Sequence, residues 1–180
     1  QLARQVDGSF VRVDVTSEAD GRAAVDTAVE QYGQLDCMFN NAGFGGALGP
    51  IDETSEEDYD ITMDVLLKGV FFGIKHAARV MKPQGSGNIL NTASVAGMMS
   101  GYSPHLYAVA KAAVITLTET TALELAHWNI RVNCICPGFI ATPLAAGLDA
   151  NEEQMDRFKD FASGAQPVER AGDPRDIAEA

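Results

Sequence analysis

Short runs of branched apolar residues alternate with helix-like segments along the chain. Four runs predict strands, at residues 10–15, 35–40, 88–94 and 130–135. The run at 35–40 is nearly all apolar, as expected of a strand that is buried on both faces. Strands that alternate with helices predict a parallel sheet with helices on both faces. We therefore expect an α/β fold with a doubly wound parallel sheet.

Capping signals predict where the intervening helices begin and end. Ser17 precedes an acidic first turn, and Gly33 is placed to end the helix that follows. Thr54 and Glu57 form a capping box three residues apart, which predicts a long helix to about residue 82. A further helix is expected over 103–126, and Asp173 before a proline predicts one more helix start.

One domain is expected over residues 1–180, because the chain has no internal repeat, low-complexity tract or linker. Residues 142–170 are polar, with helix-like patches and no predicted strand. A segment of this kind after a strand end predicts a substrate-binding lid.

The charge balance bears on partners and location. A net charge of −12 argues against nucleic-acid binding, which needs clustered Lys and Arg. No apolar run approaches the roughly 20 residues that span a bilayer, and the first residues lack a signal pattern. We therefore expect a cytoplasmic protein with no nucleic-acid or membrane partner.

The cysteines and histidines do not predict a metal site. Cys37, Cys134 and Cys136 have neither an even number nor the spacing of a zinc site, and the last two are expected to be small buried hydrophobes. The three histidines lack mutual spacing and a suitable carboxylate partner. His105 is either a pocket residue or a plain loop residue.

The strongest candidate for chemistry is the pair Tyr107 and Lys111. Residues four apart on a helix share a face, and a nearby ammonium lowers the pKa of a tyrosine from about 10, which makes its hydroxyl a usable acid and base. Ser94 ends a strand upstream, where open α/β sheets place ligands, and its hydroxyl could hold a substrate oxygen. The alternatives are an exposed helix residue beside a solvated lysine, and a turn serine.

Small-residue motifs follow the other predicted strands. Residues 40–43 (NNAG) open a glycine-rich loop, where small residues let backbone approach a ligand. Pro137 and Gly138 close the fourth strand, and Thr142 follows. Each motif alone is a turn signal, but four motifs at four strand ends indicate a ligand site.

Together these residues resemble the short-chain dehydrogenase/reductase family over essentially the whole chain. The matching stretches are Asp14 of VDVT, NNAG (40–43), NTASVAG (91–97), YAVAK (107–111), RVNCICPGFIATP (131–143) and PVERAGDPRDIA (167–178). The resemblance implies a Rossmann fold, bound NAD(H) or NADP(H), and hydride transfer between the nicotinamide and an alcohol or carbonyl carbon.

The resemblance also implies a role for each matching residue. Tyr107 would be the catalytic acid/base, Ser94 would orient the substrate oxygen, and Lys111 would lower the tyrosine pKa and hold the nicotinamide ribose. The implied cofactor-binding residues are Asp14 and Val15 at the adenine, Asn40, Ala42 and Gly43 along the adenosine, Pro137 and Gly138 farther on, and Ile140 and Thr142 at the carboxamide.

The chain departs from the family pattern at two places. It lacks the glycine-rich phosphate turn and the residue that separates NAD from NADP, so we expect it to be a portion of a longer chain. In the usual strand order, the strand at 10–15 would then have no neighbour. Leu66 stands where the family has an asparagine that holds a relay water, so the proton needs another route, such as carbonyls exposed by a bulged helix.

The resulting expectation is an oxidoreductase that interconverts a secondary alcohol and a ketone on a mostly apolar, possibly cyclic, substrate. Met98, Met99 and Tyr102 form either a pocket wall or core. Apolar faces on the two long helices predict a homo-oligomer, a dimer or tetramer. The alternatives are an extended-branch epimerase or dehydratase, a catalytically silent nucleotide-binding protein, and a fragment that is inactive by itself.

Overall fold

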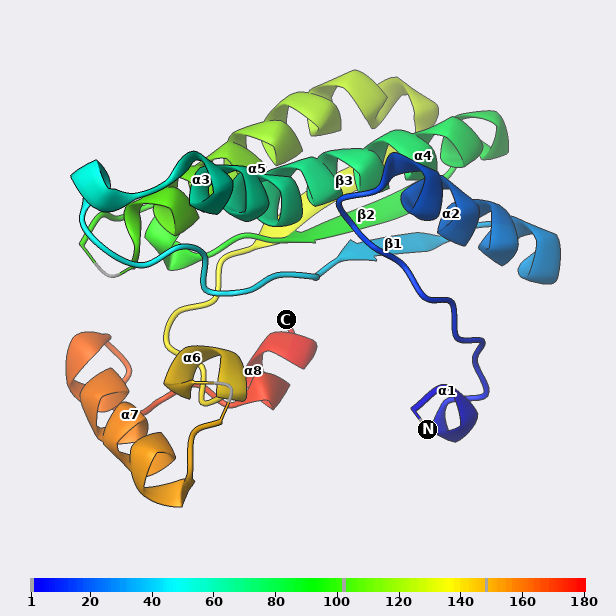
Figure 1. The fold of residues 1–180 in the computed structure, drawn as a ribbon. Coiled ribbons are helices and arrows are strands. Elements are labelled where there is room, and N and C mark those ends of the chain that lie inside the picture. The colour runs from blue at the N-terminus through cyan, green and yellow to red at the C-terminus, as the bar shows by residue number, and fades with distance from the viewer. Residues whose placement is uncertain (1, 102, 148) are drawn as a thin grey trace.

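Three parallel strands form the centre of the fold. The computed structural model describes residues 2–101, 103–147 and 149–180. Strands β1 (Cys37–Asn40), β2 (Gly87–Thr92) and β3 (Ile130–Ile135) pair side by side in the order β1-β2-β3. Helices α4 (Gly69–Gln84) and α5 (His105–Leu125) connect these strands and cover one face of the sheet (Figure 1). The predicted α/β fold with a parallel sheet is confirmed.

The predicted strand at residues 10–15 is wrong. This segment carries no strand, and the side chain of Phe10 is 82% exposed. A strand needs a partner for its backbone groups, and in the described part of the chain β1 pairs only with β2. A segment rich in β-branched and aromatic residues therefore does not form a strand on composition alone.

The first long helix behaves as its capping signals predict. Helix α2 (Glu18–Tyr32) begins after Ser17, whose hydroxyl accepts a hydrogen bond from the backbone N–H of Asp20, and ends at Gly33 in the left-handed conformation. It lies along α4, held by ion pairs that include Lys75–Glu18 at 2.5 Å. A short helix, α1 (Leu2–Gln5), precedes it.

The second long helix differs from the prediction at both ends and in its middle. Ser55, not Thr54, is its N-cap, because the Thr54 hydroxyl donates to the Pro50 carbonyl instead. Helix α3 (Glu56–Met63) continues through a π-helical turn, η2 (Asp64–Lys68), into α4, which ends at Gly85. The short 3-10 turns are η1 (Ile51–Glu53), η3 (Val95–Gly97) and η4 (Ala126–Trp128).

The helices that follow β3 form a small group on the other side of the sheet (Figure 1). It contains α6 (Pro143–Ala146), α7 (Glu152–Ala165) and α8 (Pro174–Ala178). Helix α8 begins at Asp173 with a complete capping box, as predicted. The prediction that residues 142–170 act as a lid stays a prediction.

The core lies between the sheet and helices α4 and α5. Its buried members include Val70, Met81, Ile89, Val114 and Leu125. Residues 105–128 are long and apolar enough for a bilayer span by length and by a mean hydropathy of 1.2, so the expectation that no such run exists is wrong. This helix packs on β3 and carries the buried Lys111, but only 28% of its apolar window is buried, so burial within the described residues accounts for only part of its apolar composition.

Candidate active site

The three predicted catalytic residues meet at the carboxyl end of β2. Ser94 lies just beyond β2 and is buried, and its hydroxyl accepts a hydrogen bond from the backbone N–H of Ala96 at 3.1 Å. A Cβ on Gly97 would lie 2.6 Å from the Lys111 carbonyl carbon, so glycine at this position lets η3 pack directly on α5. This close approach brings the serine loop to the helix that carries Tyr107 and Lys111.

Burial controls the protonation of Tyr107. Desolvation raises the pKa of Tyr107 above its ordinary value, and a hydrogen bond with the Ser94 side chain offsets only part of that rise. The shift runs opposite to the lowering expected from Lys111, whose effect on the tyrosine pKa stays a prediction. The lysine Nζ lies 5.5 Å from the centroid of the tyrosine ring and donates to the Thr92 carbonyl oxygen at 2.7 Å.

Lys111 is itself strongly affected by burial. Its side chain is 5% exposed, and desolvation lowers its pKa to about 8. The nearby Cys136 thiol acts in the opposite direction and raises the lysine pKa. The amine can therefore gain or lose a proton in the pH range where enzymes work, which suits a group that passes protons.

A buried polar network fixes the start of the NNAG loop. The Asn40 amide donates to the Asn91 side-chain oxygen at 2.8 Å, and the Asn91 amide donates to the Thr118 hydroxyl at 2.9 Å. Asn91 is fully buried. Beside this network, the Thr92 hydroxyl donates to the Asn41 side chain at 2.8 Å. These bonds tie β1, β2 and α5 together directly below the loop.

The glycine-rich loop then passes close to the catalytic tyrosine. A Cβ on Gly46 would lie 3.4 Å from the Tyr107 Cβ, and the Ala47 backbone N–H donates to the Thr62 hydroxyl at 3.1 Å. Ala42 and Gly43 are exposed. The loop is thus anchored at both ends, with its small residues open to a ligand.

The π-helical turn places Leu66 beneath this loop. Leu66 is 0% exposed, and a Cβ on Gly43 would lie 3.2 Å from its Cδ2 atom. The bulged helix suggested by the sequence is therefore present at the position where the family asparagine is replaced. A buried leucine at this point keeps water out of the space below the loop.

The predicted adenine residues are Asp14 and Val15, and Val15 lies beside Gly69, the residue that follows the π-helical turn. Thr16 donates from both its backbone N–H and its hydroxyl to the Asp14 carboxylate, at 2.9 and 2.7 Å. The Thr16 side chain and backbone hold the Asp14 pKa below its usual value. Val15 packs on the helix, because a Cβ on Gly69 would lie 3.0 Å from its own Cβ. The structure thus fixes this pair against the start of α4.

The predicted carboxamide segment runs from the end of β3 toward α6. The Val95 backbone N–H donates to the Pro137 carbonyl at 3.1 Å, which places this segment beside the catalytic serine loop. Ile140 and Thr142 lie farther on, and Thr142 is the N-cap of α6. Cys134 and Cys136 are half-buried against the core, whereas Cys37 is exposed.

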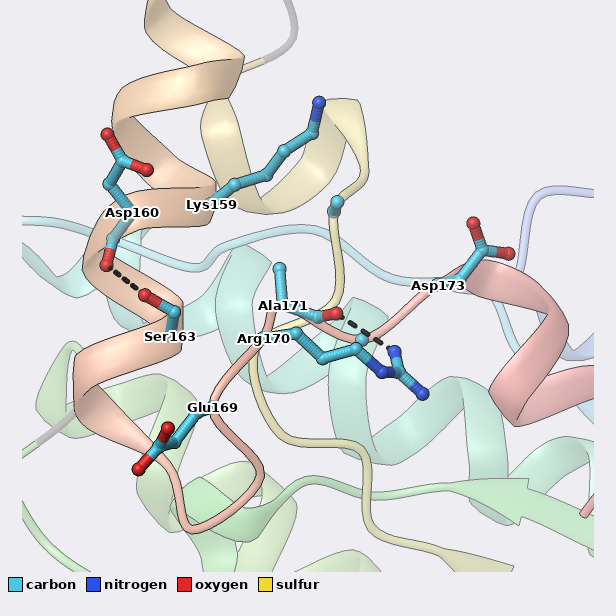
Figure 2. A pocket seen from close by; sticks show the side chains of 9 residues that line it. Lys159, Asp160, Ser163, Glu169, Arg170, Ala171 and Asp173 are labelled. Carbon is cyan, nitrogen blue, oxygen red and sulfur yellow. Dashed lines mark hydrogen bonds between the residues drawn. The ribbon is translucent and has the colours of Figure 1, made fainter.

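A hollow of about 360 Å³ lies beside the predicted lid and away from the catalytic residues. Figure 2 shows Asp160 and Ser163 on α7 and Glu169, Arg170 and Ala171 on the segment beside it. Charges of both signs line this hollow.

Two predicted pocket residues lie on the surface. Met98 and Met99 are 68% and 56% exposed, so the core-packing alternative for them is wrong, and their role as a pocket wall stays a prediction. Tyr102 lies outside the described residues. His105, the first residue of α5, is half-buried.

Several residues of this site were not predicted from the sequence. Asn91, Thr92, Thr118 and Thr62 all support the predicted residues through hydrogen bonds. The sequence did contain a sign of the role of Asn91, because asparagine is rare in buried strands and needs hydrogen-bond partners there. The sequence contained no sign that the Thr92 backbone carbonyl accepts from Lys111, since a residue of any type has such a carbonyl.

The sequence model of a family described as enoyl-(acyl carrier protein) reductase matches residues 1–180. The chain belongs to the short-chain dehydrogenase/reductase family. Momilactone A synthase of Oryza sativa subsp. japonica is 45% identical over 150 residues, which cover 82% of this chain and 55% of that protein. The mitochondrial borneol dehydrogenase of Lavandula x intermedia is 41% identical over 171 residues, covering 94% and 66%.

Solved structures of this family share the same arrangement. NAD⁺-bound xylitol dehydrogenase superposes with a TM-score of 0.82 at 35% identity, covering 96% of this chain and 70% of that one. NADP-bound ElxO gives a TM-score of 0.87 at 29% identity, covering 97% and 69%. The chain thus spans 55% and 66% of the two relatives above, which makes the activity of the whole protein a proposal.

Proposed function

We propose that the whole protein is an NAD(P)-dependent oxidoreductase that interconverts a secondary alcohol and a ketone. One observation carries this proposal: a serine, a tyrosine and a lysine from two separate segments meet at the carboxyl end of a parallel sheet, with the Lys111 Nζ 5.5 Å from the centroid of the Tyr107 ring. A nucleotide-binding protein without catalysis has no physical need of these three side chains.

The residues can divide the proton chemistry among them. In the oxidation direction, Tyr107 must first lose its own proton, against its raised pKa, and the resulting phenolate oxygen then accepts the proton of the substrate hydroxyl, while the Ser94 hydroxyl holds the substrate oxygen in place. Tyr107 then returns to its starting protonation state through the Lys111 amine, whose lowered pKa of about 8 suits this exchange. In the reduction direction each proton moves the opposite way.

The described residues fit a dinucleotide cofactor. Exposed Ala42 and Gly43 follow β1 on a loop with little side-chain bulk, and Asp14 presents a carboxylate from a fixed turn. Asn40 and Gly43 at the end of β1, and Pro137 after β3, lie at the carboxyl edge of the sheet, where open α/β sheets bind nucleotides. Bound NAD or NADP supplies or accepts the hydride, and the protein binds and orients the reactants.

The substrate class follows from the surface beside Ser94. The exposed Met98 and Met99 directly after η3 present flexible apolar side chains, which favour a mostly apolar, cyclic alcohol. Borneol is a suitable probe, since two relatives are named for it. Xylitol, for which a structural neighbour is named, is the matched polar alcohol.

The decisive experiment measures nicotinamide reduction by the full-length protein, with NAD⁺ and NADP⁺ separately, on borneol and on xylitol. We expect turnover of borneol with at least one cofactor and a kcat/KM at least about tenfold lower for xylitol. Cofactor binding without turnover of either alcohol or their ketones would favour the silent nucleotide-binding alternative. A strong preference for xylitol would contradict the apolar pocket.

We also propose that the protein is a homo-oligomer that buries the outer faces of α4 and α5. An open groove of about 670 Å³ lies between α5 and the segment from the end of α3 to the start of α4, and is lined by Met63, Leu67, Phe71, Ala113 and Leu117, among others. Phe71 is 46% exposed and Leu123 is 81% exposed. Analytical ultracentrifugation of the full-length protein should show a dimer or tetramer that Leu117→Lys dissociates. A monomer at micromolar concentration would contradict the proposal.

A further inference from the structure

Two segments far apart in sequence run side by side next to the predicted carboxamide residues. The Gly172 backbone N–H donates to the Phe139 carbonyl at 2.8 Å, and the Ala141 N–H donates to the Gly172 carbonyl at 2.8 Å. Ile140 and Gly172 form an isolated parallel bridge. A Cβ on buried Gly172 would lie 2.3 Å from the Ile140 Cδ1, so a larger residue would have to displace the end of that side chain. We call residues 166–172 the clasp.

Gln166 is the side chain that links the clasp to the opposite segment. It follows the last residue of α7 and is half-buried. Its Oε1 accepts a hydrogen bond from the Phe139 backbone N–H at 3.1 Å, and its Nε2 donates to the Arg170 carbonyl at 2.6 Å. The Oε1 atom would lie only 2.8 Å from a Cβ on Gly138. One amide thus uses a donor and an acceptor to join both segments.

The clasp is fixed at its other end by charge. The Arg170 guanidinium donates to both carboxylate oxygens of Asp176, at 2.6 and 2.9 Å. Asp176 belongs to the capping box that opens α8. The carbonyl that accepts from Gln166 therefore belongs to a residue that is itself held in place, and Gln166 has a rigid support.

We infer that Gln166 is a positioning residue that holds residues 138–142 in the shape that binds the nicotinamide carboxamide. This inference rests on the proposed function. Without the Gln166 amide, the Phe139 N–H loses this hydrogen bond, and the segment is held less firmly, by its backbone bonds to Gly172. The nicotinamide end of the cofactor should then bind more weakly, whereas the adenosine end, at Asp14 and residues 40–43, should be unaffected.

The test compares two ligands on the full-length protein. NADH or NADPH, whichever binds, reports on the whole site, and ADP-ribose, or its 2′-phosphorylated form if NADPH binds, reports on the adenosine side alone. Gln166→Leu removes both hydrogen bonds at a similar side-chain size. We expect its Kd for the dinucleotide to rise about tenfold, its Kd for the fragment to change less than about twofold, and kcat at saturating cofactor to change less than about threefold.

Two further variants separate positioning from a loss of folding. Gln166→Glu keeps the acceptor for Phe139 and loses the donor to Arg170, so its Kd should rise only about threefold. Gln154→Leu removes a matched amide from the exposed capping box at the other end of α7 and should leave both Kd values unchanged. Folding of each variant is checked by circular dichroism.

The outcomes distinguish the inference from the proposed function. Equal weakening of both ligands in Gln166→Leu, or no weakening of either, would overturn the positioning role. If Gln166→Leu does not fold, Gln166→Glu takes its place: equal weakening of the dinucleotide and the fragment, or no weakening of either, would overturn the positioning role. Failure of the wild-type protein to bind any of these ligands would overturn the proposed function, and the role of Gln166 with it.

Discussion

The catalytic cluster and the clasp are held in place by different kinds of contact. Ser94, Tyr107 and Lys111 come together because a strand end and a helix pack closely, and their side chains carry the chemistry. The clasp is held mainly by backbone groups, with Gln166 as one connecting amide. The catalytic cluster can be recognised from residue types in the sequence, whereas the clasp can be recognised only in the folded structure. Changes in the first region should abolish activity, whereas changes in the second should shift affinity.

The largest effect should follow from replacing the buried lysine. Lys111→Met removes the amine that the mechanism uses to exchange a proton with Tyr107 and that is assigned to the ribose. We expect kcat/KM to fall about 1,000-fold, with a lower kcat and a weaker cofactor affinity. Steady-state kinetics measures kcat and kcat/KM, and cofactor titration measures the affinity for the cofactor. Lys75→Met, which removes an exposed surface lysine, is the control and should be close to wild type.

The same variant should change stability in a pH-dependent way. The folded-state pKa of Lys111 is about 8, below its ordinary value of 10.5, so the unfolded chain binds more protons between these values. The cost of burying the ammonium, roughly 3 kcal/mol, is fully present below pH 8 and disappears as the pH rises toward 10.5. Lys111→Met should therefore unfold at a higher temperature than wild type at pH 7, and this advantage should shrink at pH 10. An advantage that grows with pH would contradict the assigned pKa.

The buried network under the NNAG loop should matter next. Asn91→Leu removes the acceptor of Asn40 and the donor to Thr118, leaving a buried amide without its partner. We expect the free energy of unfolding to fall by about 2 kcal/mol, measured by urea denaturation. Asn133→Leu on β3 changes an exposed asparagine and should have little effect. Equal effects of both substitutions would show that the network contributes nothing specific.

Particular residues show how far the sequence predicted the structure. The motif order predicted the meeting of Ser94, Tyr107 and Lys111, because strand ends and helical spacing follow from local patterns. The strand at 10–15 was wrong because pairing depends on a neighbouring strand, which a local pattern does not contain. Gln166 was missed because its partners are backbone groups of Phe139 and Arg170, and these carry no residue signature.

The smallest effect is expected at Leu66. Leu66→Asn restores the family residue, but it puts an amide in place of a fully buried leucine that packs against the NNAG loop. We expect kcat to change less than tenfold and the free energy of unfolding to fall by about 1 to 3 kcal/mol. A large gain in kcat without loss of stability would indicate that the natural protein is impaired in proton relay and would support the silent alternative.

The central claim is that Tyr107 exchanges the proton with the substrate, and Tyr107→Phe tests it most directly. This substitution removes one hydroxyl and keeps the ring that packs beside Lys111. Turnover and cofactor affinity should be measured on the same full-length preparation. The account predicts a kcat at least about 100-fold lower with a nearly unchanged cofactor Kd. A Tyr107→Phe enzyme with kcat within threefold of wild type would contradict it.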